Sequence, residues 1–71
     1  MMLQEYTSQA VMTMLNKYND ILTVDELCEV LNIGKNTAYK LLKNGDIKSI
    51  KIGRIYRIPK KSIKEYINQL Q

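Results

Sequence analysis

Apolar side chains recur at helical spacing in the first part of the chain. They fall at three- and four-residue steps, which places them on one face of an amphipathic helix over residues 3–18. The residues of this face are Leu3, Tyr6, Ala10, Val11, Met14, Leu15 and Tyr18. This helix either covers the core of the chain's own domain or offers a surface to a second copy or to a partner protein.

A second helix has a clearly marked beginning. Thr23 and Glu26 have the spacing of a capping box, in which each side chain accepts a hydrogen bond from the other residue's backbone N–H. Leu22 before the cap and Leu27 after it have the spacing of a hydrophobic staple. We therefore expect a helix from about Val24 to Leu31. Its apolar side comprises Leu27, Cys28, Val30 and Leu31.

A third helix follows after a short turn. The segment Asn32-Ile33-Gly34 interrupts the pattern, and the next helix is expected from Lys35 to about Asn44, with Gly45 as its C-terminal cap. Two short helices joined in this way form a helix-turn-helix. The residues of the third helix that point inward by spacing are Ala38, Leu41 and Leu42. The residues on its opposite, basic and hydrogen-bonding face are Asn36, Tyr39, Lys40 and Lys43.

A β-hairpin, or wing, is predicted next. Two runs rich in β-branched residues, Ile47 to Ile52 and Ile55 to Ile58, are separated by Gly53-Arg54, which suits a two-residue loop with Arg54 at its tip. Strand alternation predicts one buried face and one basic face. We expect Ile50 and Ile52 on the buried face, and Lys51 with Lys48 or Ser49 on the basic one.

A closing helix is predicted after Pro59, which ends the second run and suits the first turn of a helix. Its apolar residues repeat at helical spacing and are Ile63, Tyr66, Ile67 and Leu70. Three lysines near its beginning, Lys60, Lys61 and Lys64, are not favoured there by the helix dipole. They are either placed for an external anion or belong to a solvated face.

These elements predict a mainly α fold with a small β-hairpin, the winged helix-turn-helix. Residues 1–20 are expected to form an N-terminal amphipathic helix, and residues 21–71 the winged helix-turn-helix domain. A chain of 71 residues has room for one domain at most.

Composition excludes several classes of protein. One cysteine and no histidine leave no internal disulfide and no metal cluster, and Cys28 is interpreted as a small apolar residue. These absences, with no phosphate-binding glycine loop, argue against an enzyme, and we expect no cofactor. The first residues do not resemble a secretory signal, and no run approaches the roughly 18 apolar residues that would span a membrane. The expected location is the cytoplasm.

Charge is distributed unevenly along the chain. Residues 1–31 carry one basic and five acidic residues, whereas residues 32–71 carry ten basic and two acidic residues. The net charges of the two parts are therefore −4 and +8. A basic half on a compact domain is typical of a nucleic-acid-binding protein, although a solvated lysine-rich surface has the same composition.

The segment from Leu22 to Leu70 resembles the excisionase-type helix-turn-helix family, which is related to MerR-like winged modules and is common in mobile elements. The matching stretches are Leu22-Thr23-Val24-Asp25-Glu26-Leu27, Ile33-Gly34-Lys35-Asn36-Thr37-Ala38-Tyr39-Lys40-Leu41-Leu42, Lys43-Asn44-Gly45-Asp46-Ile47 and Ile52-Gly53-Arg54-Ile55-Tyr56-Arg57-Ile58-Pro59. The resemblance implies that the third helix lies in the major groove of DNA and that the wing tip reaches an adjacent minor groove. It also implies that Thr37, Tyr39 and Lys40 face DNA.

Two positions depart from that family. Gly34 stands in the turn where Ser is frequent, which removes a side-chain N-cap. Lys40 stands where Arg is common, and Lys lacks the planar fork that recognises guanine with two hydrogen bonds. Lys40 therefore does not offer the bidentate guanine contact that Arg gives in that family.

Side-chain chemistry suggests roles for the predicted DNA-binding residues. Asn36 and Lys40 are the candidates for contacts with base edges. The candidates for phosphate contacts are Lys35, Thr37, Tyr39 and Lys43. On the wing, the residues expected to contact the DNA backbone or a narrow minor groove are Lys51, Arg54 and Arg57. Packing with a solvated hydroxyl is the alternative for Tyr39 and for Tyr56.

Three functions remain open. The first is an excisionase, a recombination directionality factor that binds and bends double-stranded DNA and assists an integrase. The second is a small transcriptional regulator of a mobile element. The third is a protein-interaction adaptor that uses the N-terminal helix. Because one helix-turn-helix reads few base pairs, DNA recognition would require self-association or cooperative binding on repeated sites.

Overall fold

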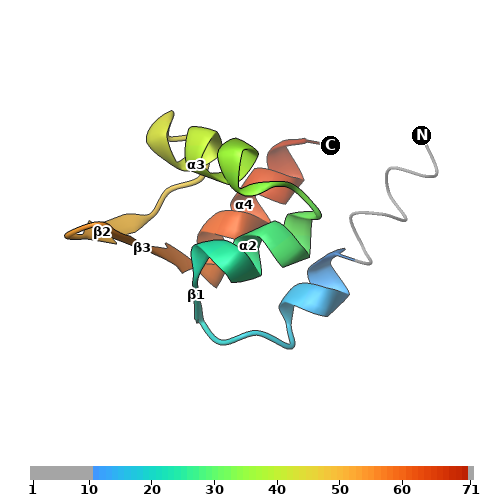
Figure 1. The fold of residues 1–71 in the computed structure, drawn as a ribbon. Helices are drawn as coiled ribbons and strands as arrows, with labels where there is room; N and C mark the ends of the chain where they lie inside the picture. Colours follow the sequence, from blue (N-terminus) through green and yellow to red (C-terminus); the bar gives the residue numbers. More distant parts are fainter. Residues whose placement is uncertain (1–10, 71) are drawn as a thin grey trace.

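The computed structural model describes residues 11–70, which form three full helices and a three-stranded sheet after a short helical segment at residues 11–15 (Figure 1). The elements in chain order are β1 (Ile21–Leu22), α2 (Val24–Leu31), α3 (Lys35–Lys43), β2 (Ile50–Ile52), β3 (Ile55–Pro59) and α4 (Lys60–Gln69). The helices lie together, and the hairpin of β2 and β3 projects beyond them. The predicted winged helix-turn-helix architecture is confirmed.

Helix α2 begins and ends where the sequence predicted. The backbone N–H of Glu26 donates to the Thr23 hydroxyl at 3.1 Å, and the N–H of Thr23 donates to the Glu26 carboxylate at 2.9 Å. The capping box is thus complete. Leu22 and Leu27 on either side of it are both fully buried in the core, as the hydrophobic staple requires. Local sequence therefore determines where this helix starts.

The turns on either side of α3 contain two left-handed residues and one extended one. Asn32 ends α2 at φ 54°, a conformation that Asn tolerates better than most residues, and its N–H donates to the carbonyl of Cys28. Gly34 is extended and offers no side-chain cap to α3. Gly45 follows the C-terminal end of α3 at φ 80°, as expected of a glycine cap.

The sheet contains one strand that the sequence did not predict. Its order is β1-β3-β2 with both pairings antiparallel, so β3 is the central strand. Leu22 of β1 pairs with Ile58, and both side chains are fully buried. The backbone N–H of Lys60 also donates to the carbonyl of Asp20 at 2.7 Å. The segment that leads into α2 is thereby fixed to the segment that leads into α4.

The prediction that Ile50 and Ile52 are buried is wrong. Both side chains are more than half exposed, and β2 is exposed along its whole length. The buried residues of the hairpin are Tyr56 and Ile58 of β3, which packs against α2 and α4. Strand alternation holds, but β2 projects past the helices, so none of the elements within residues 11–70 covers its isoleucines (Figure 1).

The core draws side chains from every described element except β2. It also includes Leu15, which is fully buried and belongs to residues 11–15. Its members are Leu15, Leu22, Leu27, Val30, Ala38, Leu42, Ile47, Tyr56, Ile58, Ile63 and Ile67. Leu31 and Leu41, which were expected to point inward, are half-buried at its margin.

The N-terminal helix differs in part from its prediction. Its helical structure ends at residue 15 rather than 18, since Lys17 and Tyr18 donate their N–H groups to carbonyls three residues earlier and so tighten the chain into a turn. Met14 is exposed, contrary to prediction. Leu15 packs into the domain's own core, and the Tyr18 hydroxyl donates to the Glu29 carboxylate of α2 at 3.1 Å. Leu3, Tyr6 and Ala10 lie outside the described residues.

Helix α4 follows its predicted pattern except at its end. Ile63 and Ile67 are buried and Tyr66 is half-buried, but Leu70 is exposed. Leu70 is the C-cap residue, so it lies beyond the last turn that packs on the core. Within residues 11–70, no helix has the length and apolar character needed to cross a membrane.

Candidate DNA-binding surface

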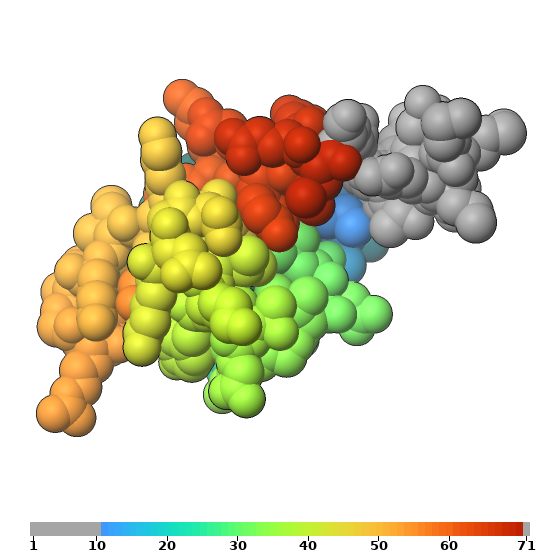
Figure 2. Space-filling model, turned by 90° about the horizontal axis from the view of Figure 1, so that it is seen from above, coloured from blue at the N-terminus to red at the C-terminus, as the bar shows by residue number. Residues whose placement is uncertain are grey.

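The outer face of α3 presents polar and basic side chains to solvent. Ala38 and Leu42 hold the opposite side of the helix in the core. The exposed residues on the outer face, which line a shallow depression together with Asn44, are Asn36, Tyr39, Lys40 and Lys43. In the view from above, α3 lies between the wing and α4 (Figure 2). The four side chains predicted to share one face therefore do so.

Aromatic contacts connect this face of α3 to the wing. The ring centroids of Tyr39 and Tyr56 are 5.9 Å apart, with the rings tilted by 55°. The Nζ atom of Lys51 lies 5.2 Å from the centroid of the Tyr56 ring, within the range of a cation–π contact. Tyr56 is buried, as the packing alternative proposed, whereas Tyr39 is exposed. These contacts fix the position of the hairpin relative to α3.

The start of α3 contains an ion pair that the sequence interpretation missed. The Nζ atom of Lys35 lies 3.1 Å from a carboxylate oxygen of Asp25, and both side chains are largely exposed. The hydrogen bond to Asp25, and then the charge of that carboxylate, raise the pKa of Lys35. The stabilisation that the raised pKa of Lys35 represents is complete below the ordinary lysine pKa and is lost as the pH rises through the raised one.

The signal for this pair was present in the sequence. Asp25 occupies the acidic first turn of α2, and a turn of only three residues brings the beginning of α3 close to it. Thr37, which the resemblance placed toward DNA, is exposed in the first turn of α3.

A small hollow of about 210 Å³ lies where α2, α3 and the wing meet. The residues that line it are Thr23, Val24, Asp25, Lys35, Tyr39, Arg54, Ile55 and Tyr56. Arg54 stands in the hairpin loop beside Gly53, whose φ of 63° forms the tight turn. The structure thus brings Arg54 of the wing tip to the same surface as Lys35 and Tyr39.

Arg57 does not join this group. It alternates with Tyr56 along β3 and pairs with Ile50 across the hairpin, so its side chain lies on the face of the sheet opposite the ring of Tyr56. Lys51 pairs with Tyr56 and shares the face that is turned toward α3. The predicted wing residues therefore divide between two faces.

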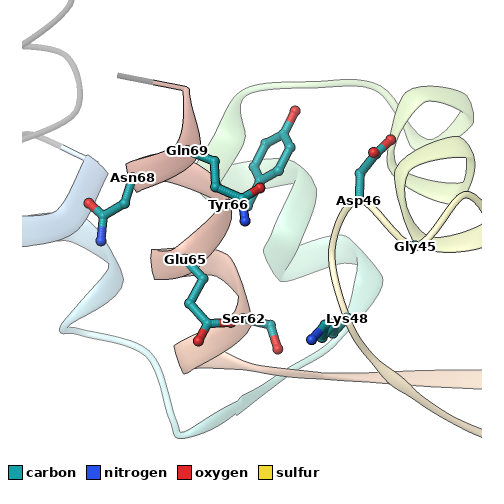
Figure 3. A pocket seen from close by; sticks show the side chains of 8 residues that line it. All are labelled: Gly45, Asp46, Lys48, Ser62, Glu65, Tyr66, Asn68 and Gln69. Atoms are coloured by element: carbon teal, nitrogen blue, oxygen red, sulfur yellow. The ribbon is translucent and has the colours of Figure 1, made fainter.

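A larger hollow of about 520 Å³ lies between α4 and the segment that follows α3 (Figure 3). Its lining is polar and of mixed charge and consists of Gly45, Asp46, Lys48, Ser62, Glu65, Tyr66, Asn68 and Gln69. Asp46 and Glu65 are the two acidic residues of the otherwise basic part of the chain. An anionic ligand is therefore disfavoured here, which separates this hollow from the basic surface of α3.

Comparison with known proteins identifies relatives of this domain. Residues 21–71 match the helix-turn-helix domain family. A Saccharopolyspora erythraea protein named "Probable excisionase" is 40% identical over 50 residues, which cover 70% of this chain and 51% of that protein. A Mycobacterium tuberculosis protein named "Putative DNA-binding protein" is 30% identical over 47 residues, which cover 66% of this chain and 60% of that protein. No solved structure gave a significant match to the chain.

The match to the family covers the whole of the described helix-turn-helix, the wing and α4. The chain spans about half to three fifths of the length of these curated relatives. What is shared is thus the domain that carries the basic outer face of α3 and the wing beside it. The chain belongs to the helix-turn-helix domain family and is a DNA-binding helix-turn-helix protein.

Proposed function

We propose that this chain is an excisionase, a recombination directionality factor of a mobile element that binds and bends double-stranded DNA and thereby assists an integrase. The observation that carries the proposal is the surface on which the exposed face of α3 and the wing tip stand side by side, fixed by the Tyr39–Tyr56 contact. The similarity to the protein named "Probable excisionase" supports the role in recombination. The domain that acts on DNA is residues 21–71.

In the proposed complex, α3 lies in the major groove of DNA. Asn36 and Lys40 contact base edges, because an amide and an ammonium group can hydrogen-bond with the acceptors and donors exposed there. The residues around them hold phosphates and are Lys35, Thr37, Tyr39 and Lys43. Lys35 exchanges its pairing with Asp25 for a phosphate when DNA binds.

The wing extends the contact to the adjacent minor groove. Arg54 at the tip enters it, since a narrow minor groove has a strongly negative potential that attracts arginine. Lys51 contacts the backbone from the face of the sheet that is turned toward α3. Arg57, on the other face, reaches a phosphate only if the DNA bends around the wing, so its contribution reports on bending.

The chain reads few base pairs as a single copy, so neighbouring copies bind cooperatively on repeated sites. A regulator of transcription would use the same surface on promoter DNA, and the relatives named only as DNA-binding fit that role equally. The location of the bound site therefore decides between recombination and transcription.

The proposal is tested by titrating the protein against four duplexes at several salt concentrations. These are the two ends of the surrounding element, its promoter and a random sequence. Preference for an end, with a bend seen by electrophoretic mobility of circularly permuted fragments, supports the excisionase. Preference for the promoter supports the regulator. Failure to bind any duplex at low salt contradicts DNA binding altogether and favours an adaptor.

A further inference from the structure

The face of the sheet that points away from α3 is largely apolar, and its isoleucines are exposed in the part of the chain that the structure describes. Ile50, Ile52 and Ile55 share this face, because Ile52 pairs with Ile55 and strand alternation puts Lys51 and Tyr56 on the other. Ile55, next to the hairpin loop, also borders the hollow beside α3. Ile21 of β1 joins them through its pairing with Pro59. The exposed fractions of the four isoleucines range from 44% to 64%. Isolated exposed isoleucines need no explanation, but four on one sheet face form a patch of the kind that marks an interaction site.

The charged residues around this patch are mostly basic. Arg57 lies on the same face, opposite Ile50. At the β1 end, Ile21 and Pro59 also line a hollow of about 420 Å³, whose other lining residues are Asp20, Lys60, Lys61 and Lys64. The apolar face therefore continues directly into a cluster of lysines. Asp20 is the single acidic residue of that hollow.

We propose that this face, defined by the four isoleucines with Arg57 and the adjoining lysines, binds an acidic amphipathic segment of a partner protein. Apolar side chains of that segment cover the isoleucines. Its carboxylates pair with Lys61 and Lys64 at one end and with Arg57 along the sheet. The patch extends roughly 13 Å along β3 from Ile55 to Pro59, at about 3.3 Å per residue, which suits one short segment rather than a large domain interface.

The composition of the face favours a protein segment over DNA. A phosphate backbone binds cations and hydrogen-bond donors, but it gains little from contact with branched aliphatic side chains. The face is also turned away from the outer surface of α3, so one copy can hold DNA through α3 while this partner covers the isoleucines, and Arg57 alone is a candidate for both. Charge complementarity selects an acidic segment, because Arg57 on the face and three lysines at its β1 end are opposed, in that hollow, by Asp20 alone. The inference does not depend on the role in recombination.

The experiment is a selection of random 16-residue peptides displayed on phage against the immobilised full-length chain. Enriched peptides are expected to combine apolar residues with Asp or Glu. Two double variants then locate the binding: Ile50→Thr with Ile52→Thr, and Lys61→Gln with Lys64→Gln. Threonine keeps the β-branched shape that suits a strand, and every substituted side chain is wholly or partly exposed, so the fold is retained, which circular dichroism checks. Each double variant should weaken peptide binding at least about tenfold, a loss of 1.4 kcal/mol.

Matched controls lie outside the face. Met14→Gln removes an exposed apolar side chain and Lys17→Gln an exposed lysine, and neither should change peptide binding. The inference would be overturned by no enrichment, by enriched peptides without acidic residues, by peptide binding that both double variants leave intact, or by sedimentation equilibrium showing a dimer that the isoleucine variant dissociates. The last would assign the face to a second copy. A tenfold loss of DNA affinity in the isoleucine variant would assign it to DNA instead.

Discussion

Helices α2 and α3 are neighbours of almost equal length, eight and nine residues, yet they are stabilised in different ways. Helix α2 has a complete capping box and two acidic residues in its first turn, where the helix dipole favours them. Helix α3 begins at Gly34 without a side-chain cap and has Lys35 in its first turn, where the dipole disfavours a cation. Local interactions support the first helix far better than the second.

This difference indicates where function constrains the sequence. Helix α3 is held in place by Ala38 and Leu42 in the core and by the Tyr39 contact with the wing, so its outer residues are free to serve another purpose. The uncapped start and the first-turn lysine lower the local stability of α3, and a helix that presents donors and cations to DNA can retain them for that function. Five substitutions test the contrast between α2, which local interactions stabilise, and α3, whose outer face is available for DNA.

The largest effect is expected from Leu27→Ala in α2. The side chain is fully buried beside the capping box, and its loss should lower the free energy of unfolding by about 2–5 kcal/mol. Leu41→Ala in α3 is the matched control, because that side chain is only half-buried and should cost clearly less. Urea denaturation measures both. Equal losses would mean that α3 carries as much of the core as α2.

When DNA binding is measured instead of stability, a substitution in α3, Lys40→Ala, should have the larger effect. The substitution leaves the core untouched, but affinity for the preferred duplex should fall about tenfold or more, as for loss of a base contact. Affinity for a random duplex should fall less, since only the phosphate attraction is reduced there. Fluorescence anisotropy with both duplexes measures the difference, and Lys17→Ala is the control. An equal loss on both duplexes would make Lys40 a phosphate contact.

Thr23→Ala removes half of the capping box. The free N–H of Glu26 then loses its acceptor, and the free energy of unfolding should fall by about 1 kcal/mol. The thermal unfolding midpoint should fall by several degrees for a domain of this size. Thr37→Ala, an exposed threonine inside α3 rather than at a cap, is the comparison and should change the midpoint less. An unchanged midpoint in Thr23→Ala would show that α2 does not depend on its cap.

Asp25→Asn removes the carboxylate that holds Lys35. Stability should change little, because an ion pair between two largely exposed side chains is screened by solvent. DNA affinity should rise a few-fold at low salt, since Lys35 becomes free for a phosphate and a negative charge leaves the surface. Glu29→Gln, which removes an acid elsewhere on α2, controls for net charge. A fall in DNA affinity would mean that the pair holds Lys35 in its binding position.

The smallest effect is expected from Gly34→Ser, which gives α3 the cap that it lacks. Gly34 is already extended, and an added Cβ would meet no atom within 4 Å, so serine fits without strain. Stability should rise by a few tenths of a kcal/mol. The measurement is the urea midpoint at unchanged slope. A loss of stability would show that the turn needs glycine for a reason other than backbone freedom.

The sequence predicted best those features that depend on neighbours along the chain. The Thr23–Glu26 box determines the start of α2, and Gly45 adopts the left-handed conformation expected after α3. The outer face of α3 also followed from spacing alone, because Ala38 and Leu42 leave one orientation for the helix.

Features that depend on distant segments were missed. Strand β1 has only two residues and exists because Leu22 reaches Ile58 across the sheet. The exposure of Ile50 and Ile52 could not be foreseen, since alternation gives two faces without saying which one a helix covers. Alternation also did not show that Arg54 and Arg57 lie on two different surfaces, because it does not say which face of the hairpin is turned toward α3.

The most direct test of the central claim, that the outer face of α3 binds DNA, is the salt dependence of affinity. The logarithm of affinity falls with the logarithm of salt concentration in proportion to the phosphates contacted, with a slope of roughly −0.9 for each. The variant with Lys35→Ala and Lys43→Ala should have a slope shallower by about two contacts, whereas Lys17→Ala should keep the original slope. A double variant with an unchanged slope and affinity would contradict the account.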